Sequence, residues 1–313
     1  MHSNNTYPLI SVVMITYAHQ EFIAQAVEGV LMQEYKGEIE LIIANDKSPD
    51  KTDTIVKEMI RDHPNGNWIK YTNHETNLGM MPNFIWALGQ CEGKYIALCE
   101  GDDYWTDLLK LQKQVDFLEE NLKYGAIANN ALVLNDNGDT YLFGIRKSRI
   151  IKDADIIRSR QFATASILFR NNICLPEELR NLMVGDTPLF LSISKKEPIY
   201  YDNIVTSVYR HGVQGVTSKF KSVGFKRKLI EFNIFIDRFT NNIHSEIIRK
   251  NIKEIDEFYY KESSFKKVLK RMLKYFDNVL FGIFLKVLNQ KNCNHFDIRY
   301  RPFYVKIRYI ILG

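Results

Sequence analysis

The segment Glu100-Gly101-Asp102-Asp103 places three carboxylates almost side by side, directly after Lys94–Cys99. That preceding run (KYIALC) is apolar, as expected for a buried strand. Carboxylates this close repel one another, and a hard divalent cation such as Mg²⁺ or Mn²⁺ would relieve the repulsion. Such a cation would bridge a diphosphate and neutralise the charge that develops as the diphosphate leaves. The alternative is an acidic turn that caps a helix starting near Asp107, but the position directly after a buried strand favours the metal.

Polar side chains also follow three other apolar runs. Thr16 and Tyr17 follow the first, Asn45 and Asp46 the second, and residues 77–79 the third. Ligands bind at the carboxyl ends of the strands in an open parallel sheet, so we expect these groups to converge on one rim. Asp46 has two interpretations that stay open here, an ordinary turn residue or an acceptor for a nucleobase N–H.

The elements that position these groups alternate in type up to Cys99. The expected strands are 9–15, 40–44, 68–72 and 94–99, and the expected helices are 21–33, 52–62 and 83–91. This alternation predicts a parallel sheet that is covered on both faces. Later elements are mixed: helices 107–121 and 187–194, strands 162–169 and 199–208, and a hairpin of 125–134 with 140–143 around Asn137-Gly138. The sequence therefore predicts an α/β fold that becomes mixed after its first half.

Five short motifs follow one another along the chain. They are Ile10–Tyr17 (ISVVMITY), Val30–Gln33, Glu40–Asp50, Asn77–Gly79 and Glu100–Trp105. Together they resemble the family-2 glycosyltransferases over roughly residues 8–215, and several ordered motifs are more specific than any one. The resemblance implies a GT-A domain over residues 7–218, a Rossmann-like nucleotide-sugar-binding fold with a mixed, mostly parallel sheet flanked by helices.

The resemblance further implies a nucleotide-sugar donor and a divalent metal, Mn²⁺ or Mg²⁺. The residues implied in nucleotide-sugar binding are Thr16, Tyr17, Asp46, Asn77, Gly79, Gly101 and Asp102. Thr16 and Tyr17 would line the base and ribose, and Asp46 would read the base edge. Glu100-Gly101-Asp102 stands where the family's Asp-x-Asp metal motif stands. Because its first acid is Glu, Asp102 is the implied direct metal ligand and Glu100 a second one.

Two later segments also match the family. Val184–Phe190 resembles the stretch that carries the catalytic base, which implies that Asp186 deprotonates the acceptor hydroxyl as it attacks the anomeric carbon with inversion. Val208–His211 resembles a motif near the diphosphate, which implies a metal or phosphate contact from His211. A purely structural histidine is the alternative there.

Charge is unevenly distributed along the 313 residues. Residues 219–313 carry 21 Lys and Arg against 9 Asp and Glu, a net charge of +12, whereas residues 1–218 carry 21 against 28, a net charge of −7. The region 219–313 is expected to be a basic, mostly helical appendage with an apolar stripe over 265–276. Two roles stay open: attachment to an anionic membrane, or packing of the apolar face on the catalytic domain. Nucleic-acid binding is not expected, since no recognised binding module accompanies the charge.

Compartment and acceptor follow from composition and from the resemblance. The four cysteines form no metal or disulfide pattern, and neither a signal peptide nor an apolar run of about 18 residues is seen. We expect a cytoplasmic protein, peripheral on the inner face of the plasma membrane if the basic region binds lipid. The resemblance implies a saccharide or lipid-linked saccharide acceptor in surface polysaccharide synthesis.

The sequence fits two other classes of protein less well than a glycosyltransferase. A dinucleotide-dependent oxidoreductase would need G-x-G-x-x-G after the first strand, and the segment there is Thr16-Tyr-Ala-His-Gln-Glu21. A glycosyltransferase-like partner protein without catalysis stays open, although the retained Asp46, Asp102 and Asp186 argue against it.

Overall fold

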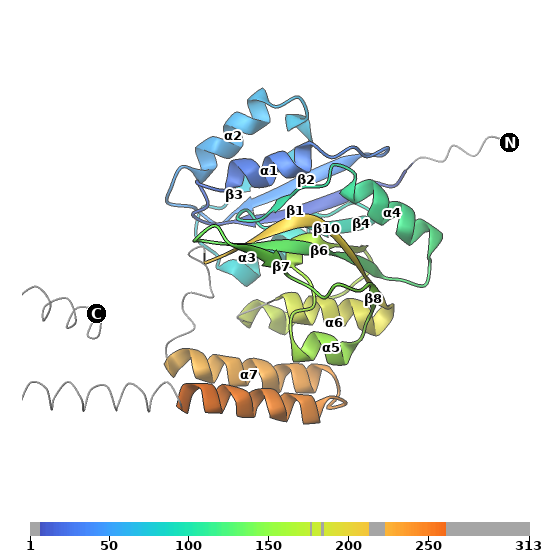
Figure 1. Cartoon of the computed structure of the whole chain (residues 1–313). Helices are drawn as coiled ribbons and strands as arrows, with labels where there is room; N and C mark the ends of the chain where they lie inside the picture. The colour runs from blue at the N-terminus through green and yellow to red at the C-terminus, as the bar shows by residue number, and fades with distance from the viewer. Residues whose placement is uncertain (1–6, 176, 183–184, 213–222, 261–313) are drawn as a thin grey trace, which may run out of the picture. The chain divides into compact units, whose positions relative to one another are not determined.

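A computed structural model describes residues 7–175, 177–182, 185–212 and 223–260. The chain divides into a compact unit over Met1–Ile255 and a second unit over Asp256–Gly313. The fold below is that of the first unit (Figure 1).

A single mixed sheet runs through the described part of this unit. Its strands are β1 Ile10–Thr16, β2 Ile39–Asn45, β3 Ile69–Asn73, β4 Tyr95–Leu98, β5 Tyr104–Trp105, β6 Ala126–Asn135, β7 Thr140–Leu142, β8 Arg149–Ile151, β9 Ile167–Arg170 and β10 Ile199–His211. The order across the sheet is β3-β2-β1-β4-β9-β6-β10-β5, with β7 on β6 and β8 on β10. The pairs β1–β2, β1–β4 and β2–β3 are parallel, and β9 pairs antiparallel with both β4 and β6. The predicted change from a parallel to a mixed sheet after the fourth strand is confirmed.

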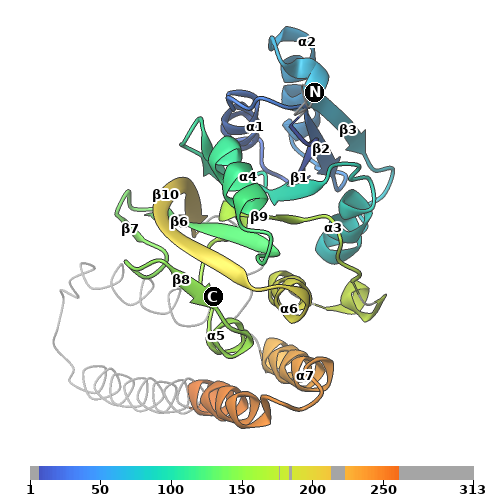
Figure 2. The same cartoon turned by 90° about the vertical axis from the view of Figure 1, so that its right-hand side faces the viewer.

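Helices cover both faces of the sheet (Figures 1 and 2). They are α1 Ile23–Leu31, α2 Thr52–Asp62, α3 Met80–Leu88, α4 Lys110–Glu120, α5 Asp153–Arg158, α6 Asp186–Lys196 and α7 Val223–Phe239, with 3-10 turns η1 Gly66–Trp68, η2 Thr164–Ser166 and η3 Glu177–Asn181. One core cluster joins the sheet to α1, α2 and α4, and the other joins it to α3, α5, α6 and α7.

The central strands explain why two cores exist. Side chains alternate between the faces of a strand, so a strand covered on both sides must be apolar throughout. In β1, Val12 and Met14 belong to the first cluster and Val13 to the second. In β4, Ala97 and Leu98 divide in the same way. These near-continuous apolar runs are what the sequence showed.

Several elements differ from the predicted ones. The strand predicted at 162–169 starts only at Ile167, because Thr164–Ser166 forms a 3-10 turn. The helix predicted from Asp107 begins at Lys110, and the last strand extends to His211. The short elements β5, β8 and α5 were not predicted, since two to six residues show no readable periodicity.

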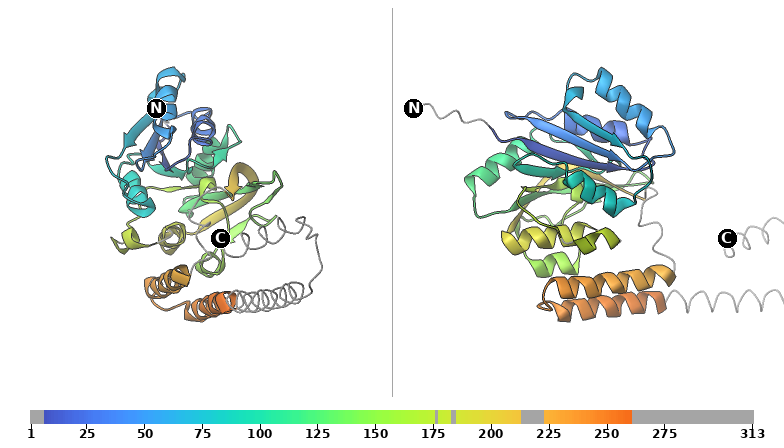
Figure 3. Two further views of the ribbon diagram at one scale, coloured as in Figure 1. Left: turned by 90° about the vertical axis from the view of Figure 1, so that its left-hand side faces the viewer. Right: turned by 180° about the vertical axis from the view of Figure 1, so that it is seen from behind.

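The first part of the basic region packs on this same unit. Ile236 of α7 and Ile248 of the following helix, which spans residues 245–260, are buried in the second core cluster. Asn251 also donates a hydrogen bond from Nδ2 to the Ile157 carbonyl at 3.0 Å. Figure 3 shows α7 beside α5 and α6, on the face of the sheet opposite α1 and α2. The stripe at 265–276 lies outside the described residues, and the division at residue 218 stays a prediction.

Within the described ranges, no helix is both long and apolar enough to span a bilayer.

Candidate active site

The carboxyl ends of neighbouring parallel strands meet at one rim, as predicted. Thr16 ends β1 and pairs in register with Asn45, the last residue of β2. Beyond the strands, the Asp46 N–H donates to the Thr16 carbonyl at 3.0 Å, and the Gly101 N–H donates to the Ile15 carbonyl at 3.0 Å. Backbone hydrogen bonds thus hold the segments after β2 and β4 against the end of β1.

Gly101 allows the acidic segment to lie directly against the end of β1. A Cβ at this position would lie 2.7 Å from Thr16 Oγ1 and 2.9 Å from His19 Nδ1, closer than such atoms approach. Thr16 Oγ1 in turn lies 3.2 Å from His19 Nδ1. Tyr17, 47% exposed, stands at the open side of the rim. The sequence did not point to His19, since a lone histidine carries no spacing signal.

Asp46 is held by the loop that follows β3. The Leu78 N–H donates to its Oδ1 at 2.6 Å and the Gly79 N–H to its Oδ2 at 2.9 Å. Asn77 Nδ2 donates to the Asp46 carbonyl at 2.9 Å. Gly79 has φ +89°, a backbone conformation that favours glycine. The structure therefore brings Asp46, Asn77 and Gly79 together, with the carboxylate ordering the loop.

The three carboxylates of the acidic segment have different surroundings. Asp103 is buried and accepts the Arg210 N–H at 2.9 Å, which ties the segment to β10. Glu100 Oε2 is buried without a hydrogen-bond partner, and burial, followed by the charge of Asp102, raises the Glu100 pKa to about 7. Asp102 keeps part of its side chain exposed, with Oδ2 3.9 Å from His19 Nε2. Glu100 and Asp102 are thus the two carboxylates left for a ligand.

The fit of a divalent cation rests on these two residues. The part of the chain that the structure describes contains no group of three or more His, Cys, Asp or Glu side chains able to hold a metal. His211 is exposed, its Nδ1 lying 3.1 Å from Asn135 Oδ1, and it does not join Glu100 and Asp102 in such a group. One or two carboxylates plus phosphate oxygens suffice for Mg²⁺. The unpartnered Glu100 oxygen next to Asp102 fits that kind of site.

Arg210, one residue before His211, contacts the acidic segment directly. Its Nη1 donates to the Asp102 carbonyl at 2.5 Å, and its Nη2 donates to Gln25 Oε1. The guanidinium lies over the Tyr104 ring at 4.5 Å and over the Phe22 ring at 4.9 Å. In the motif Val208–His211, Arg210 is therefore a residue that contacts the backbone of the acidic segment directly.

Asp186 begins α6 and pairs with a cation that sequence reasoning missed. Its Oδ1 accepts the Thr187 N–H at 2.7 Å, and its Oδ2 lies 3.3 Å from Arg160 Nε. The Arg160 guanidinium lies 5.2 Å from the centres of the Phe143 and Tyr209 rings. Burial is the largest influence on the Glu100 pKa, and the charges of Asp102, Arg160 and Asp186 also act on it. These four ionisable groups therefore share one electrostatic environment.

Comparisons with known proteins agree with this architecture. The model of the family "Glycosyl transferase family 2" matches residues 11–171. An uncharacterised protein of Mycobacterium tuberculosis is 31% identical over 210 residues, 66% of this chain and 60% of its own length. A putative glycosyltransferase of Bacillus subtilis, EpsE, is 33% identical over 147 residues, 47% of this chain and 49% of its own. The chain thus spans about 60% or less of the length of these two relatives.

Solved structures show the same fold at low sequence identity. S. aureus TarS 1-349 in complex with UDP-GlcNAc superposes with a TM-score of 0.58 at 19% identity, covering 79% of this chain and 71% of that one. The mannosyltransferase PcManGT from Pyrobaculum calidifontis, in complex with GDP-Man and Mn²⁺, gives a TM-score of 0.56 at 14% identity, covering 81% and 74%. With the ordered rim motifs and the match over residues 11–171, the chain belongs to glycosyltransferase family 2 and has the GT-A fold.

Proposed function

We propose that the protein is an inverting, metal-dependent glycosyltransferase that moves a sugar from a nucleoside-diphosphate sugar, with UDP-sugars the first to test, to an acceptor hydroxyl. One observation carries the proposal: Glu100 Oε2, shortly after the parallel strand β4, is buried without a hydrogen-bond partner, and burial followed by the charges of Asp102 and Asp186 raises the Glu100 pKa. Family membership supports it, as do the nucleotide-sugar complexes of TarS and PcManGT.

The nucleotide end of the donor is assigned to the β1 and β2 side of the rim. Thr16 and Tyr17 would contact the base and ribose, and Asn77 and Gly79 would border the nucleotide. The Asp46 carboxylate already accepts two backbone N–H groups. Each carboxylate oxygen has a second lone pair, so Asp46 can order this loop and still accept a base N–H.

Metal binding is assigned to Asp102 and Glu100, with His211 the third residue implied by the family resemblance. Mn²⁺ or Mg²⁺ on these carboxylates and the donor phosphates would neutralise the charge on the leaving diphosphate. The Mn²⁺ in the PcManGT complex supports a divalent ion in this fold. Asp102 and Gly101 would position the sugar-diphosphate from the protein side.

Asp186 is assigned the role of general base. The Thr187 N–H fixes its Oδ1, and Arg160 pairs with its Oδ2, so the carboxylate is oriented before any acceptor arrives. It would accept the proton of the acceptor hydroxyl during a single inverting displacement.

The acceptor is proposed to be a saccharide or lipid-linked saccharide in surface polysaccharide synthesis. A lipid-linked acceptor would place the enzyme on the cytoplasmic face of an anionic membrane. The net charge of +12 over residues 219–313 suits that location.

Nucleoside diphosphate release tests the proposal. UDP-, GDP- and dTDP-sugars are supplied with Mn²⁺ and then with a chelator, to wild type, Asp102→Asn and the control Asp62→Asn, whose carboxylate is exposed and pairs with Arg61. We expect Mn²⁺-dependent release in wild type and the control, and loss in Asp102→Asn. Nucleoside diphosphate release that is unchanged by the chelator, or that is the same in Asp102→Asn as in wild type, would refute the metal role. Binding of a donor without any release would favour a non-catalytic partner protein.

A further inference from the structure

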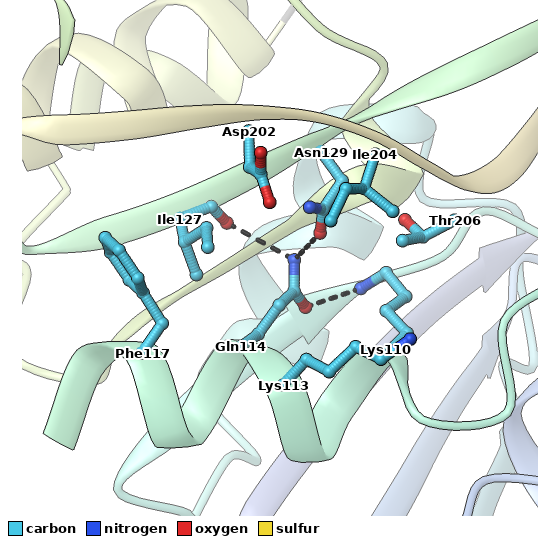
Figure 4. Close-up of a pocket in the computed structure, with 9 residues that line it drawn as sticks. All are labelled: Lys110, Lys113, Gln114, Phe117, Ile127, Asn129, Asp202, Ile204 and Thr206. Atoms are coloured by element: carbon cyan, nitrogen blue, oxygen red, sulfur yellow. Dashed lines mark hydrogen bonds between the residues drawn. The ribbon is translucent and has the colours of Figure 1, made fainter. Parts of the chain in front are cut away.

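A pocket of about 120 Å³ lies between α4 and the strands β6 and β10 (Figure 4). None of the rim residues assigned to the donor or the metal lines it. Its lining residues are Lys110, Lys113, Gln114, Phe117, Ile127, Asn129, Asp202, Ile204 and Thr206. The proposed function therefore leaves this pocket without a role.

The pocket exists because β10 does not follow β6 in regular register. The pairing shifts between Asp202 and Val205 and again between Val205 and Ser207. Such bulges bend a strand and change where its side chains point. Ile204 at the bulge is 50% exposed, so the strand does not close over α4 there.

One wall of the pocket is a fixed hydrogen-bond network around Gln114. Its Nε2 donates to Asn129 Oδ1 at 2.6 Å and to the Ser166 carbonyl at 2.9 Å, which leaves Oε1 to accept from Lys110 Nζ at 2.8 Å. Three carbonyl-type acceptors lie around the amide nitrogen, including the Ile127 oxygen at 3.5 Å, so the amide orientation is determined by its surroundings.

Lys110 is fully buried, and no carboxylate forms an ion pair with it in the described parts of the chain. Its Nζ lies 4.1 Å from the centre of the Trp105 ring, an attractive cation–π contact. The neighbouring Lys113 pairs instead with Asp107 at 2.7 Å. An ammonium has three N–H donors, so Lys110 retains donor capacity after its bond to Gln114.

Two further groups in the pocket have spare hydrogen-bonding capacity. Thr206 is 2% exposed, and its Oγ1 has no hydrogen-bond partner. Asn129 uses its Oδ1 for Gln114, which leaves its Nδ2 as a donor. Figure 4 shows Lys110, Asn129 and Thr206 around the same space. A buried hydroxyl without a partner is costly, so a ligand that accepts from these groups is stabilised.

The charges and the size of the pocket limit the kinds of ligand that it can bind. Its interior offers hydrogen-bond donors and one cation. At the edge of the pocket, one carboxylate oxygen of Asp202 accepts a hydrogen bond from Ser148 Oγ at 2.8 Å, and the other is able to accept one. Phe117 and Ile204 provide apolar surface. A volume of about 120 Å³ admits roughly four waters, which is room for a carboxylate with two or three carbons, so a small acid fits whole and a longer acid enters by its carboxylate end.

We propose that this pocket binds the carboxylate of a small hydroxy acid or of an acidic sugar, with the carboxylate on Lys110, Thr206 and Asn129 and a hydroxyl on Asp202. Burial lowers the pKa of the Lys110 ammonium to about 7, so an anionic ligand would supply the negative charge that the surroundings of this lysine lack. The proposal stands whether or not the rim transfers a sugar.

The pocket also connects to the acidic segment. Trp105, on which Lys110 lies, follows Asp102 and Asp103 by a few residues and donates from Nε1 to the Ala165 carbonyl at 2.6 Å. A carboxylate that draws Lys110 away from the ring changes the surroundings of this tryptophan. Ligand binding should therefore alter tryptophan fluorescence.

Fluorescence and calorimetric titrations with lactate, glucuronate and glucose test the proposal. Variants are Lys110→Met, the near-isosteric Thr206→Val, and the control Lys57→Met, in which an exposed lysine paired with Asp53 is replaced. Circular dichroism checks the fold of each.

We expect lactate or glucuronate, but not glucose, to bind wild type and Lys57→Met, with at least 10-fold weaker binding to Lys110→Met or Thr206→Val. Binding of both acids identifies the carboxylate group as the ligand, and binding of glucuronate alone identifies an acidic sugar. No binding of either acid, equal binding of glucose, or full affinity in both pocket variants overturns the proposal. Because Thr206→Val removes only a hydroxyl, the test holds even if Lys110→Met does not fold.

Discussion

Asp46 and Glu100 follow the strands on either side of β1, yet the hydrogen bonding of their carboxylates is opposite. Asp46 is 3% exposed and accepts a backbone N–H at each oxygen, so the protein itself satisfies it. Glu100 has an oxygen that is buried without a partner, and its pKa is raised by burial and by Asp102. The first carboxylate orders a loop, whereas the second keeps an oxygen that no donor of the described chain satisfies. At this rim, the chain itself satisfies the carboxylate on one side and leaves the one on the other side without a hydrogen-bond partner.

The largest effect should come from Asp186, the proposed general base, whose charge acts on Glu100. In Asp186→Asn, Oδ1 can still accept the Thr187 N–H, so α6 should start as before. The variant cannot accept a proton, and general bases contribute roughly 10²–10⁴-fold to rate. We expect kcat to fall by about that factor while the donor Kd measured by calorimetry stays unchanged. Unchanged kcat would remove Asp186 from the reaction.

Lys110 extends the comparison to a second buried charge that the chain leaves without an ion pair. Its pKa is about 7 in the folded protein, against about 10.4 for an unfolded lysine. Between these values the unfolded chain binds one more proton, so this group makes the free energy of unfolding rise with pH, on the order of 3 kcal/mol. Urea unfolding at pH 6.5 and 9.5 should therefore show a change in unfolding free energy that is more positive in wild type than in Lys110→Met by about this amount. Equal slopes in both proteins would contradict it.

Gly101 links the two sides, because it lets the acidic segment lie against Thr16. Gly101→Ala should reduce the free energy of unfolding by about 1–3 kcal/mol, since the added Cβ would meet Thr16 Oγ1 at 2.7 Å. Thermal denaturation measures the change. Gly89→Ala is the control, because the nearest atom to its Cβ is 3.3 Å away. A loss in Gly89→Ala as large as that in Gly101→Ala would show that the close approach to Thr16 is not the cause.

The matched pair Asp46→Asn and Glu100→Gln tests the difference between the two carboxylates directly. We expect the effects of this pair on the unfolding free energy to be the smallest of those predicted here. Asp46→Asn loses an acceptor for a backbone N–H and should cost about 1–2 kcal/mol of unfolding free energy. Glu100→Gln breaks no hydrogen bond at Oε2, which has no partner, and relieves repulsion with Asp102, so the unfolding free energy should stay equal or rise. Greater destabilisation by Glu100→Gln than by Asp46→Asn would contradict the conclusion that the chain satisfies Asp46 and leaves Glu100 unsatisfied.

Sequence alone predicted the sheet and most of the rim, because strand ends and ordered motifs are local features. It identified Asp46, Asn77 and Gly79, which the structure brings together. It could not find Arg160, because the pairing with Asp186 joins residues from two irregular junctions. For the same reason it did not point to Arg210, whose contact with Asp102 crosses 108 positions of the chain.

Metal-dependent nucleotide binding tests the central claim most directly, since it asks whether the unsatisfied side of the rim takes a cation with a diphosphate. UDP, GDP and dTDP are titrated by calorimetry with Mn²⁺ or with chelator into wild type, Asp102→Asn and Asp62→Asn. The account predicts that Mn²⁺ strengthens binding of at least one nucleotide by 10-fold or more in wild type and Asp62→Asn, and not in Asp102→Asn. Nucleotide affinity that is the same with Mn²⁺ and with chelator, or the same in Asp102→Asn as in wild type, would contradict it.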